Sequence, residues 1–261
     1  MRLGSRFLLA LTIWGATLPP ATAQSVFRFT AIPDQNTARL QERFGGVAAY
    51  LSEKLGVQVE YIPVKSYAAS VAAFKNSEVQ LAWFGGLSGV QARLAVPGSK
   101  AIAQGEEDLA FVSYFIAHHS TGLTTSDAFP AQIAGRTFTF GSKGSTSGRL
   151  MPEYYVRQHL GKAPNEVVDR VGFSGDHSKT LALVQSGAYQ VGALNYKVWD
   201  NEVAEGKVDT SKVSIIWRTP AYPDYNWTVR GDVDATYGEG FADRLQQELI
   251  GLEDRALLDA F

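Results

Sequence analysis

A short stretch rich in glycine and hydroxyl side chains has the residue types that can hold an anion. Ser145, Thr146 and Ser147 follow Gly144 and come just before a segment with helical character. The first backbone N–H groups of a helix have no intrahelical acceptor, and the helix dipole adds partial positive charge at the same end. Three hydroxyl groups beside those N–H groups predict an anion site that needs no cationic side chain.

The same stretch also has a purely structural interpretation, because serine and threonine are common helix caps. Pro152 bears on the choice, since a proline deep inside a helix costs about 3 kcal/mol. A helix that begins near Gly148 tolerates this proline and leaves residues 144–147 free to form a concave nest of backbone amides. We therefore expect the helix to begin near Gly148 and the preceding turn to bind the anion.

Two enzyme motifs that this stretch resembles are absent. GSTSG has Thr146 where a G-x-S-x-G nucleophile elbow has serine, and residues 141–147 lack the Gly-Lys-Ser/Thr ending of a P-loop. Asp176 and His177 with Ser147 would form a hydrolytic triad only if sequence neighbours supplied both the base and its orienting acid, which rarely gives triad geometry. We expect a binding protein without catalytic residues, with a secreted hydrolase as the less favoured alternative.

The N-terminus has the pattern of a secretory signal peptide. Arg2 and Arg6 precede or flank the start of the apolar run 7–18, and the small residues 21–23 follow it. The apolar run is shorter than the about 20 residues of a membrane-spanning helix. We expect residues 1–23 to be cleaved and the mature chain to be exported to the periplasm.

The composition narrows the possible partners. The chain has no cysteine, which excludes a disulfide framework, a thiol nucleophile and a thiolate metal site. Its formal net charge of -2 argues against nucleic acid or an anionic membrane as the main partner. His118 and His119 are adjacent, and adjacent residues of a strand point to opposite faces of a sheet. We expect no metal and no cofactor, and we expect a monomer.

Strand-like and helix-like patterns alternate along the mature chain. The first run predicts strands at 27–32, 57–61, 79–84, 101–103 and 111–116, and helices at 40–55, 67–74 and 87–94. After a polar stretch the order begins again, with strands at 137–140, 167–173 and 190–194, a helix that ends at Leu160 and another at 178–184. This order predicts an α/β fold with parallel sheets.

The loops of the two runs correspond in position. Aligning the second run on the first places residues 144–147 on residues 34–37, and His177 on Tyr67. Open α/β sheets bind ligands beyond the carboxyl ends of their strands, where loops lead into helix N-termini. Matching loops from two similar lobes would therefore face each other across a cleft.

The expected lobes are joined by two crossovers. Lobe 1 is expected to comprise residues 24–117 and 221–261, and lobe 2 residues 118–220. The crossovers then lie near His118 and near Thr219–Pro223. Two short connections of this kind form a hinge, which predicts a clamp that buries its ligand and excludes water.

Segments distributed along the mature chain carry a resemblance to a known family. They include TFTFGSKGSTSGRLMPEYY, VGFSGDHSKTLALVQSGAYQVGALNY and TPAYPDYNWTVRGDV, and the STSG and SGDH motifs within them are the most specific. The chain resembles the periplasmic phosphonate/phosphite-type solute-binding proteins of ABC importers over essentially all of its mature length. Within that group it most resembles the branch assigned to selenate transport.

The resemblance implies a two-lobed type II periplasmic binding fold with a hinged cleft. It implies that the oxyanion is held by the loop Ser145-Thr146-Ser147, by Tyr67 from the first lobe and by His177 from the second. The protonation state of His177 is left open, because histidine titrates near neutral pH.

Four further residues correspond to positions in the pattern of this family. Trp83 and Phe84 correspond to the aromatic pair that ends the third strand, and Asn195 and Tyr196 correspond to the end of a strand in the second lobe. Trp83 and Phe84 end an apolar strand, so core packing is the alternative to a place in the pocket.

The chain departs from the family pattern at two places. Relatives that take aminoalkyl phosphonates carry an acidic residue about where Tyr225 stands, so an amine-bearing ligand is disfavoured. Similar proteins continue beyond the apolar-patterned residues 252–258 with a further piece that packs on the first lobe. Whether Phe261 is the complete C-terminus is therefore left open.

The expected function is that of a receptor that captures a small tetrahedral oxyanion, closes around it and delivers it to an ABC permease and ATPase complex in the inner membrane. Selenate, phosphonate, phosphite and phosphate-like ligands are the candidates. A site made only of donors favours a dianion such as selenate, whereas a carboxylate would accept the proton of a phosphorus acid. Asp34, Asp176 and Asp224 are the candidate acceptors. A receptor that presents its ligand to a sensor protein remains the alternative.

Overall fold

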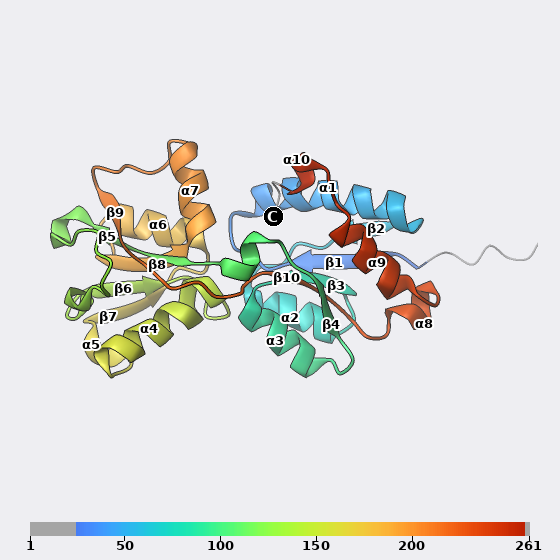
Figure 1. The fold of residues 1–261 in the computed structure, drawn as a ribbon, viewed down its shortest axis with the longest axis horizontal. Helices are drawn as coiled ribbons and strands as arrows, with labels where there is room; N and C mark the ends of the chain where they lie inside the picture. Colours follow the sequence, from blue (N-terminus) through green and yellow to red (C-terminus); the bar gives the residue numbers. More distant parts are fainter. Residues whose placement is uncertain (1–24, 259–261) are drawn as a thin grey trace, which may run out of the picture.

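The computed structural model describes residues 25–258. The expected signal peptide at residues 1–23 and the C-terminal residue Phe261 lie outside the described residues. The described chain forms two α/β lobes side by side, each built on a five-stranded sheet (Figure 1).

The two sheets have equivalent strand orders. The first, in the order β2-β1-β3-β10-β4, comprises β1 (Phe27–Ala31), β2 (Val59–Tyr61), β3 (Leu81–Phe84), β4 (Lys100–Ala103) and β10 (Asn226–Val229). The second, in the order β7-β6-β8-β5-β9, comprises β5 (Ser113–His118), β6 (Thr137–Phe140), β7 (Arg170–Phe173), β8 (Val191–Asn195) and β9 (Val213–Arg218). The sequence therefore predicted these two similar lobes correctly.

Helices cover both faces of each sheet (Figure 1). In the first lobe they are α1 (Thr37–Leu55), α2 (Tyr67–Lys75), α3 (Gly86–Ala95), α8 (Val233–Tyr237), α9 (Phe241–Ile250) and α10 (Arg255–Leu258). In the second lobe they are α4 (Met151–Leu160), α5 (Pro164–Val167), α6 (His177–Gln185) and α7 (Tyr196–Ala204). Four short helical turns complete the described elements: η1 (Glu107–Ala110), η2 (His119–Thr121), η3 (Ala131–Ile133) and the wide turn η4 (Thr146–Leu150).

Helix α1 shows how local sequence specifies these elements. Leu40, Phe44 and Leu51 recur at helical spacing and are all buried against the first sheet. Gly56 ends the helix in the left-handed conformation, with φ of 67°, which glycine adopts without steric cost. The sequence therefore predicted the end of this helix correctly.

The expectation of parallel sheets is wrong at one strand of each lobe. β10 runs antiparallel to β3 and β4, and β5 runs antiparallel to β8 and β9. Each of these strands follows directly after a crossover from the other lobe. Such a strand enters its sheet at the cleft and runs away from it, whereas the parallel strands run toward the cleft. Both sheets are therefore mixed.

The position of β5 also changes the expected lobe boundary. β5 pairs within the second sheet, so the first crossover consists of residues 104–112 and precedes the boundary expected at residues 117 and 118. The second crossover, residues 219–225, connects β9 to β10. The backbones of Phe111 and Tyr222 exchange two N–H···O hydrogen bonds of 2.9 Å, which join the two crossovers. The hinge is therefore a pair of antiparallel segments.

Candidate anion-binding site

The helix that follows β6 begins earlier than expected. Ser145 is its N-cap, with Oγ accepting from the Gly148 N–H at 2.9 Å, and the helical turn η4 begins at Thr146. The first, wide turn thus begins slightly before the expected start near Gly148, and the regular helix α4 begins after it, at Met151. This wide turn accommodates Pro152, which cannot donate to the carbonyl groups of Ser147 and Gly148. Ser113 Oγ and the Gly141 N–H donate to them instead, at 2.7 and 2.8 Å.

The three hydroxyl side chains of this turn are buried and have different partners. Ser145 caps the helix, and Thr146 Oγ1 accepts from the N–H of Leu87 on α3, 3.0 Å away in the first lobe. Ser147 Oγ is buried close to the Asp224 carboxyl group, but it has no hydrogen-bond partner of good geometry among the described residues. One hydroxyl therefore caps the turn, one joins the lobes, and one is left without such a partner.

Tyr67 and His177 occupy equivalent places at the start of α2 and α6. Their preceding residues, Ser66 and Asp176, are the N-caps, and each cap accepts from an N–H three residues further on. The correspondence of the two loops that the sequence predicted is thus confirmed at both helix starts.

The hydroxyl of Tyr67 points to the region where the lobes meet. Its side chain packs against Gly144, where a Cβ atom would lie 3.0 Å from Tyr67 Cβ, so the glycine permits this close approach. The hydroxyl is buried close to Ser145, but it has no hydrogen-bond partner of good geometry among the described residues. Burial raises the pKa of Tyr67 well above its usual value of 10.0, so the hydroxyl keeps its proton and can donate it.

The imidazole of His177 is a second buried donor. Its Nδ1 accepts from the Asn195 N–H at 3.2 Å, which places the proton of the neutral ring on Nε2. Burial lowers the pKa of His177 to about 4, so the ring is neutral at pH 7. Nε2 has no hydrogen-bond partner in the described part of the chain. The protonation state that the sequence left open is therefore a neutral ring with an available N–H.

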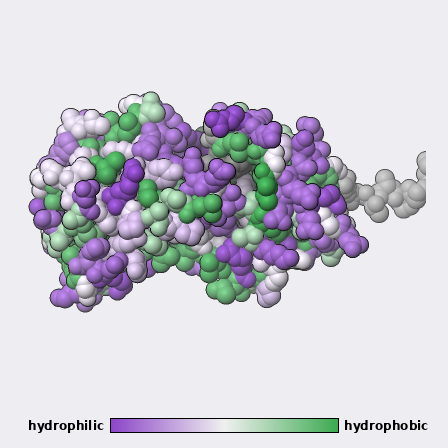
Figure 2. Space-filling view, viewed as in Figure 1, coloured by the Kyte–Doolittle hydropathy of each residue, from purple (hydrophilic) through white to green (hydrophobic). Residues whose placement is uncertain are grey.

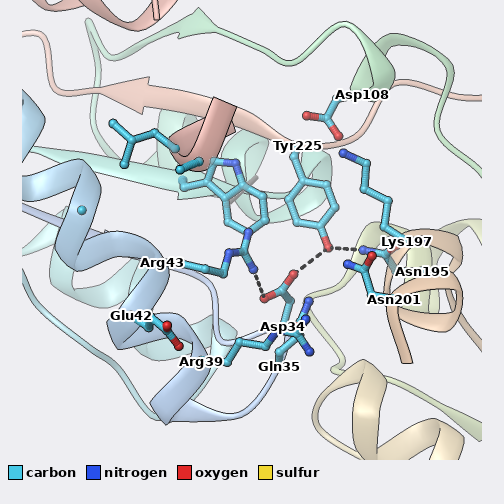
Figure 3. A pocket seen from close by; sticks show the side chains of 14 residues that line it. Asp34, Gln35, Arg39, Glu42, Arg43, Asp108, Asn195, Lys197, Asn201 and Tyr225 are labelled. Atoms are coloured by element: carbon cyan, nitrogen blue, oxygen red, sulfur yellow. Dashed lines mark hydrogen bonds and ion pairs between the residues drawn. The ribbon is translucent and has the colours of Figure 1, made fainter. Parts of the chain in front are cut away.

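Asp34 places a carboxylate beside these donors. It lies in the loop after β1, is 1% exposed, and its backbone oxygen accepts from the His177 N–H at 3.1 Å. Tyr225 donates to Oδ2 at 3.3 Å, while Oδ1 has no hydrogen-bond partner among the described residues and lies 3.7 Å from Arg43 Nη1 (Figure 3). Burial raises the pKa of Asp34 and the Arg43 charge opposes that rise.

The other two candidate acceptors are engaged. Asp224 Oδ1 accepts from the Gly86 N–H at the start of α3, at 2.9 Å, and burial raises its pKa to about 6. Asp176 caps α6 and forms an ion pair of 2.8 Å with Lys179. Thr146 and Ser147 also lie next to the Asp224 carboxyl group. Of the three candidates, Asp34 is the one with a fully buried oxygen that accepts no hydrogen bond from a described residue.

Four buried polar atoms without a hydrogen-bond partner thus belong to loops that meet at the lobe interface: Asp34 Oδ1, Tyr67 OH, Ser147 Oγ and His177 Nε2. Two come from each lobe. The direct contacts between Asp34 and His177 and between Tyr67 and Gly144 bring these loops together. A buried polar group without a partner costs about 1 to 3 kcal/mol, so these four atoms form a candidate contact surface for a small polar ligand.

The remaining expected site residues lie in three different places. Trp83 stacks on Tyr225, with ring centroids 4.2 Å apart, and Asn195 Nδ2 donates to the Tyr225 hydroxyl at 3.0 Å. Phe84 is fully buried and packs against Phe74 in the core of the first lobe. Tyr196 packs against the first crossover and donates to Glu107 at 3.3 Å. The structure brings Trp83 and Asn195 to the cleft, Phe84 to the core and Tyr196 to the hinge.

A cleft of about 310 Å³ opens beside Asp34. Trp83, Tyr225 and Asn195 line it together with the cations Arg39, Arg43 and Lys197 (Figure 3). The space-filling view shows the narrowing of the molecule between the lobes (Figure 2). None of these three cations was predicted from the sequence, because each is one charged residue on a helix that carries several.

Ion pairs join the elements at the rim of this cleft. Arg39 on α1 pairs with Glu205 at the end of α7 and so connects the two lobes. Lys197 on α7 pairs with Glu107 in the first crossover at 2.6 Å. Together with the Thr146 and His177 contacts, these pairs hold the lobes in contact across the cleft.

Comparison with known proteins identifies the family. Residues 29–261 match the family model for the periplasmic substrate-binding protein of ABC phosphonate transporters. The chain belongs to this family. This binding protein is 41% identical to the probable ABC transporter phosphite-binding protein PhnD1 of Prochlorococcus marinus (strain MIT 9301), over 93% of this chain and 84% of the relative.

Two further comparisons agree with this assignment. This binding protein is 24% identical to the phosphonates-binding periplasmic protein of Escherichia coli (strain K12), over 79% of this chain and 62% of the relative. Its structure matches that of Prochlorococcus marinus PhnD1 in complex with methylphosphonate with a TM-score of 0.86, over 90% of this chain and 89% of the other. The two-lobed periplasmic binding fold that the sequence predicted is confirmed.

The described part of this binding protein lacks two other kinds of feature. Within residues 25–258, no helix combines the length and apolar character needed to cross a bilayer. The same residues contain no group of three or more histidine, aspartate and glutamate side chains that could hold a metal ion. The relatives with which it shares its family are transport proteins rather than enzymes.

Proposed function

We propose that this protein is the receptor of an ABC importer that binds a small phosphorus oxyanion carrying one proton, with phosphite and methylphosphonate as the preferred ligands. The observation that supports this choice is the chemistry of the four unpaired buried atoms. Tyr67 and His177 can donate hydrogen bonds, Ser147 can donate as well as accept, and the Asp34 carboxylate can only accept.

A monoanionic phosphite or phosphonate matches this set. Its two unprotonated oxygens accept from the tyrosine, histidine and serine donors, and its P–OH group donates to Asp34. The fourth substituent, a hydrogen or a methyl group, requires no hydrogen bond. Phosphate would bring a fourth oxygen for which the set provides no further partner, so that oxygen would lose its hydration without compensation.

The same set disfavours selenate and sulfate. These dianions have no proton near neutral pH and offer only acceptor oxygens, so the Asp34 carboxylate would repel them. The chain also has Tyr225 rather than an acidic residue where an amino group would need one. Its hydroxyl is bonded to Asp34 and Asn195, which supports ligands without an amine.

Delivery to a permease follows from closure. The ligand would touch both lobes, since Asp34 and Tyr67 belong to the first lobe and Ser147 and His177 to the second. It would therefore stabilise the closed form over the open form, and the permease would recognise that closed form. We propose that a permease and ATPase complex in the inner membrane receives the ligand and that the receptor itself, as a monomer, catalyses no reaction.

Titration calorimetry with phosphite, methylphosphonate, phosphate, sulfate and selenate tests the ligand assignment. We expect phosphite and methylphosphonate to bind more tightly than the other three. Tighter binding of selenate or sulfate would contradict the assignment. Deletion of the gene should abolish growth on phosphite or methylphosphonate as the phosphorus source, and unchanged growth would favour a sensory role.

A further inference from the structure

Arg43 occupies an unusual position for a cation in this cleft. It lies on α1, its side chain is 12% exposed, and its Nη1 is 3.7 Å from Asp34 Oδ1. Its guanidinium group lies over the rings of Phe44 and Trp83, 5.1 Å from each ring centroid. The guanidinium packs against two buried rings close to the carboxylate, and Asp34 Oδ1 has no hydrogen-bond partner among the described residues. That oxygen therefore keeps its capacity to accept from a ligand.

Among the described residues, Arg43 is the cation whose charge acts on Asp34; Arg39 and Lys197 line the same cleft but pair with Glu205 and Glu107, and the His177 ring is neutral. Tyr225 on the second crossover donates to Oδ2, and the phenols of Tyr61 on β2 and Tyr67 on α2 also face the carboxylate. Asp176 before α6 and Asp224 on the second crossover interact with it as like charges. Burial and both aspartates raise the pKa of Asp34, whereas the Arg43 charge, and after it the Tyr225 and backbone hydrogen bonds, lower it.

We propose that Arg43 keeps Asp34 ionised in the closed cleft and thereby makes the receptor select ligands that carry a proton. This inference rests on the proposed function. It gives Arg43, which is not one of the residues with an unpaired buried atom, the role of controlling the charge of Asp34. Arg43 acts through Asp34, so it is a positioning residue for ligand selectivity.

Removing the positive charge of Arg43 should change the Asp34 carboxyl group from a hydrogen-bond acceptor to a donor. Without Arg43, Asp34 would take up a proton and become a hydrogen-bond donor, so the site would consist of donors. Such a site suits a dianion. In the wild type the charges of Arg43 and the ionised Asp34 sum to zero. In a variant with a neutral residue at position 43 and a protonated Asp34, the sum is again zero. The general attraction of the site for anions would therefore change little, while its preference among anions would change.

The test compares the affinities of full-length mature protein for phosphite and for sulfate in the wild type, Arg43→Met and Arg43→Lys. In the wild type, phosphite affinity should fall as rising pH converts the monoanion to the dianion. In Arg43→Met, the ratio of phosphite to sulfate affinity should shrink about tenfold. This is the change expected if the loss of the Arg43 charge raises the pKa of Asp34 by about one unit. The phosphite pH dependence should flatten, and Arg43→Lys should restore both properties.

Arg39→Met is the matched control, because Arg39 lies one turn away on the same helix and also lines the cleft. It should weaken both ligands by the same factor. In an Asp34→Asn background, Arg43→Met should produce no further change in the ratio, because the acceptor is already gone. Arg43→Gln, which keeps a polar side chain, provides the same readout if Arg43→Met does not fold.

Two failures are distinguishable. If the wild type does not prefer phosphite to sulfate, the proposed function is wrong. If the wild type has that preference but Arg43→Met and Arg43→Gln keep both the affinity ratio and the phosphite pH profile, Arg43 is merely structural and this inference is wrong while the proposed function stands.

Discussion

The inner site and the rim of the cleft differ in how their polar groups are satisfied. Inside, the available groups of Tyr67, Ser147 and His177 are buried and have no hydrogen-bond partner among the described residues. At the rim, Arg39 and Glu205 already pair, and their side chains are 29% and 34% exposed. Buried unpaired groups gain most from a ligand, whereas exposed ion pairs contribute little. Affinity and selectivity should therefore come from the inner site, and the rim should mainly bias closure.

The largest effect that separates the two regions should appear in the pH dependence of stability. Burial lowers the folded-state pKa of His177 from 6.5 to about 4, so the unfolded chain binds the proton more readily between these values. The resulting contribution to stability is present above about pH 6.5 and is lost as the pH falls toward about 4, by up to about 3 kcal/mol. The buried carboxyl groups with raised pKa values act in the opposite direction.

Comparing the wild type with His177→Gln isolates the histidine, because both proteins keep those carboxyl groups. The free energy of unfolding, measured by urea denaturation, should fall more steeply in the wild type than in the variant as the pH is lowered. Parallel curves would mean that the ring is exposed enough to titrate normally.

The second effect concerns ligand affinity. His177→Ala removes the donor at Nε2 and leaves the Asn195 N–H without its acceptor. Hydrogen bonds to charged groups contribute about 1.5 to 3 kcal/mol, so phosphite affinity should fall about 100-fold. His159→Ala is the matched control, since that histidine is exposed on α4 and stacks on Phe129. Calorimetry that finds equal losses for the two variants would remove His177 from the site.

A smaller effect should follow from removing one oxygen atom. Tyr67→Phe deletes the unpaired hydroxyl and keeps the ring, so phosphite affinity should fall about tenfold. The unliganded variant should be at least as stable as the wild type, because it no longer buries an unsatisfied polar atom. Tyr50→Phe, which loses a bond to the Glu248 backbone oxygen, should show the reverse: unchanged affinity and a lower melting temperature. A Tyr67→Phe protein that is destabilised but binds normally would assign the hydroxyl a structural role.

The difference between inner site and rim also explains what the sequence could predict. Ser147 and His177 stand in short local motifs at helix starts, and the physics of helix termini applies wherever the lobes lie. Asp34 was one of three equivalent candidates, and only the partners of Asp176 and Asp224 distinguish it. Those partners are tertiary contacts. The sequence pattern therefore identified the type of chemistry but not the one carboxylate that has a free oxygen.

Other features depend on tertiary pairing that no local pattern contains. The residues of β5 read as a strand in either lobe, and only its pairing with β8 and β9 assigns it to the second. The wide turn before Pro152 depends on Ser113, which is distant in sequence and supplies the substitute hydrogen bond. Arg43 looks like any charged residue of an amphipathic helix until Asp34 and Trp83 are placed beside it.

The smallest effect should come from the rim. Arg39→Gln removes the ion pair between α1 and α7, so it should favour the open form slightly and weaken phosphite binding about two- to threefold, through faster ligand release. Because the pair is partly exposed, about 1 M salt should abolish the difference from the wild type. Arg28→Gln is the matched control, since the Arg28 and Glu60 pair lies within the first lobe and cannot influence closure.

Stopped-flow release rates at low and high salt measure the effect of Arg39→Gln. A loss for Arg39→Gln as large as that for Tyr67→Phe, and insensitive to salt, would mean that the rim determines affinity and that the division between inner site and rim is incorrect.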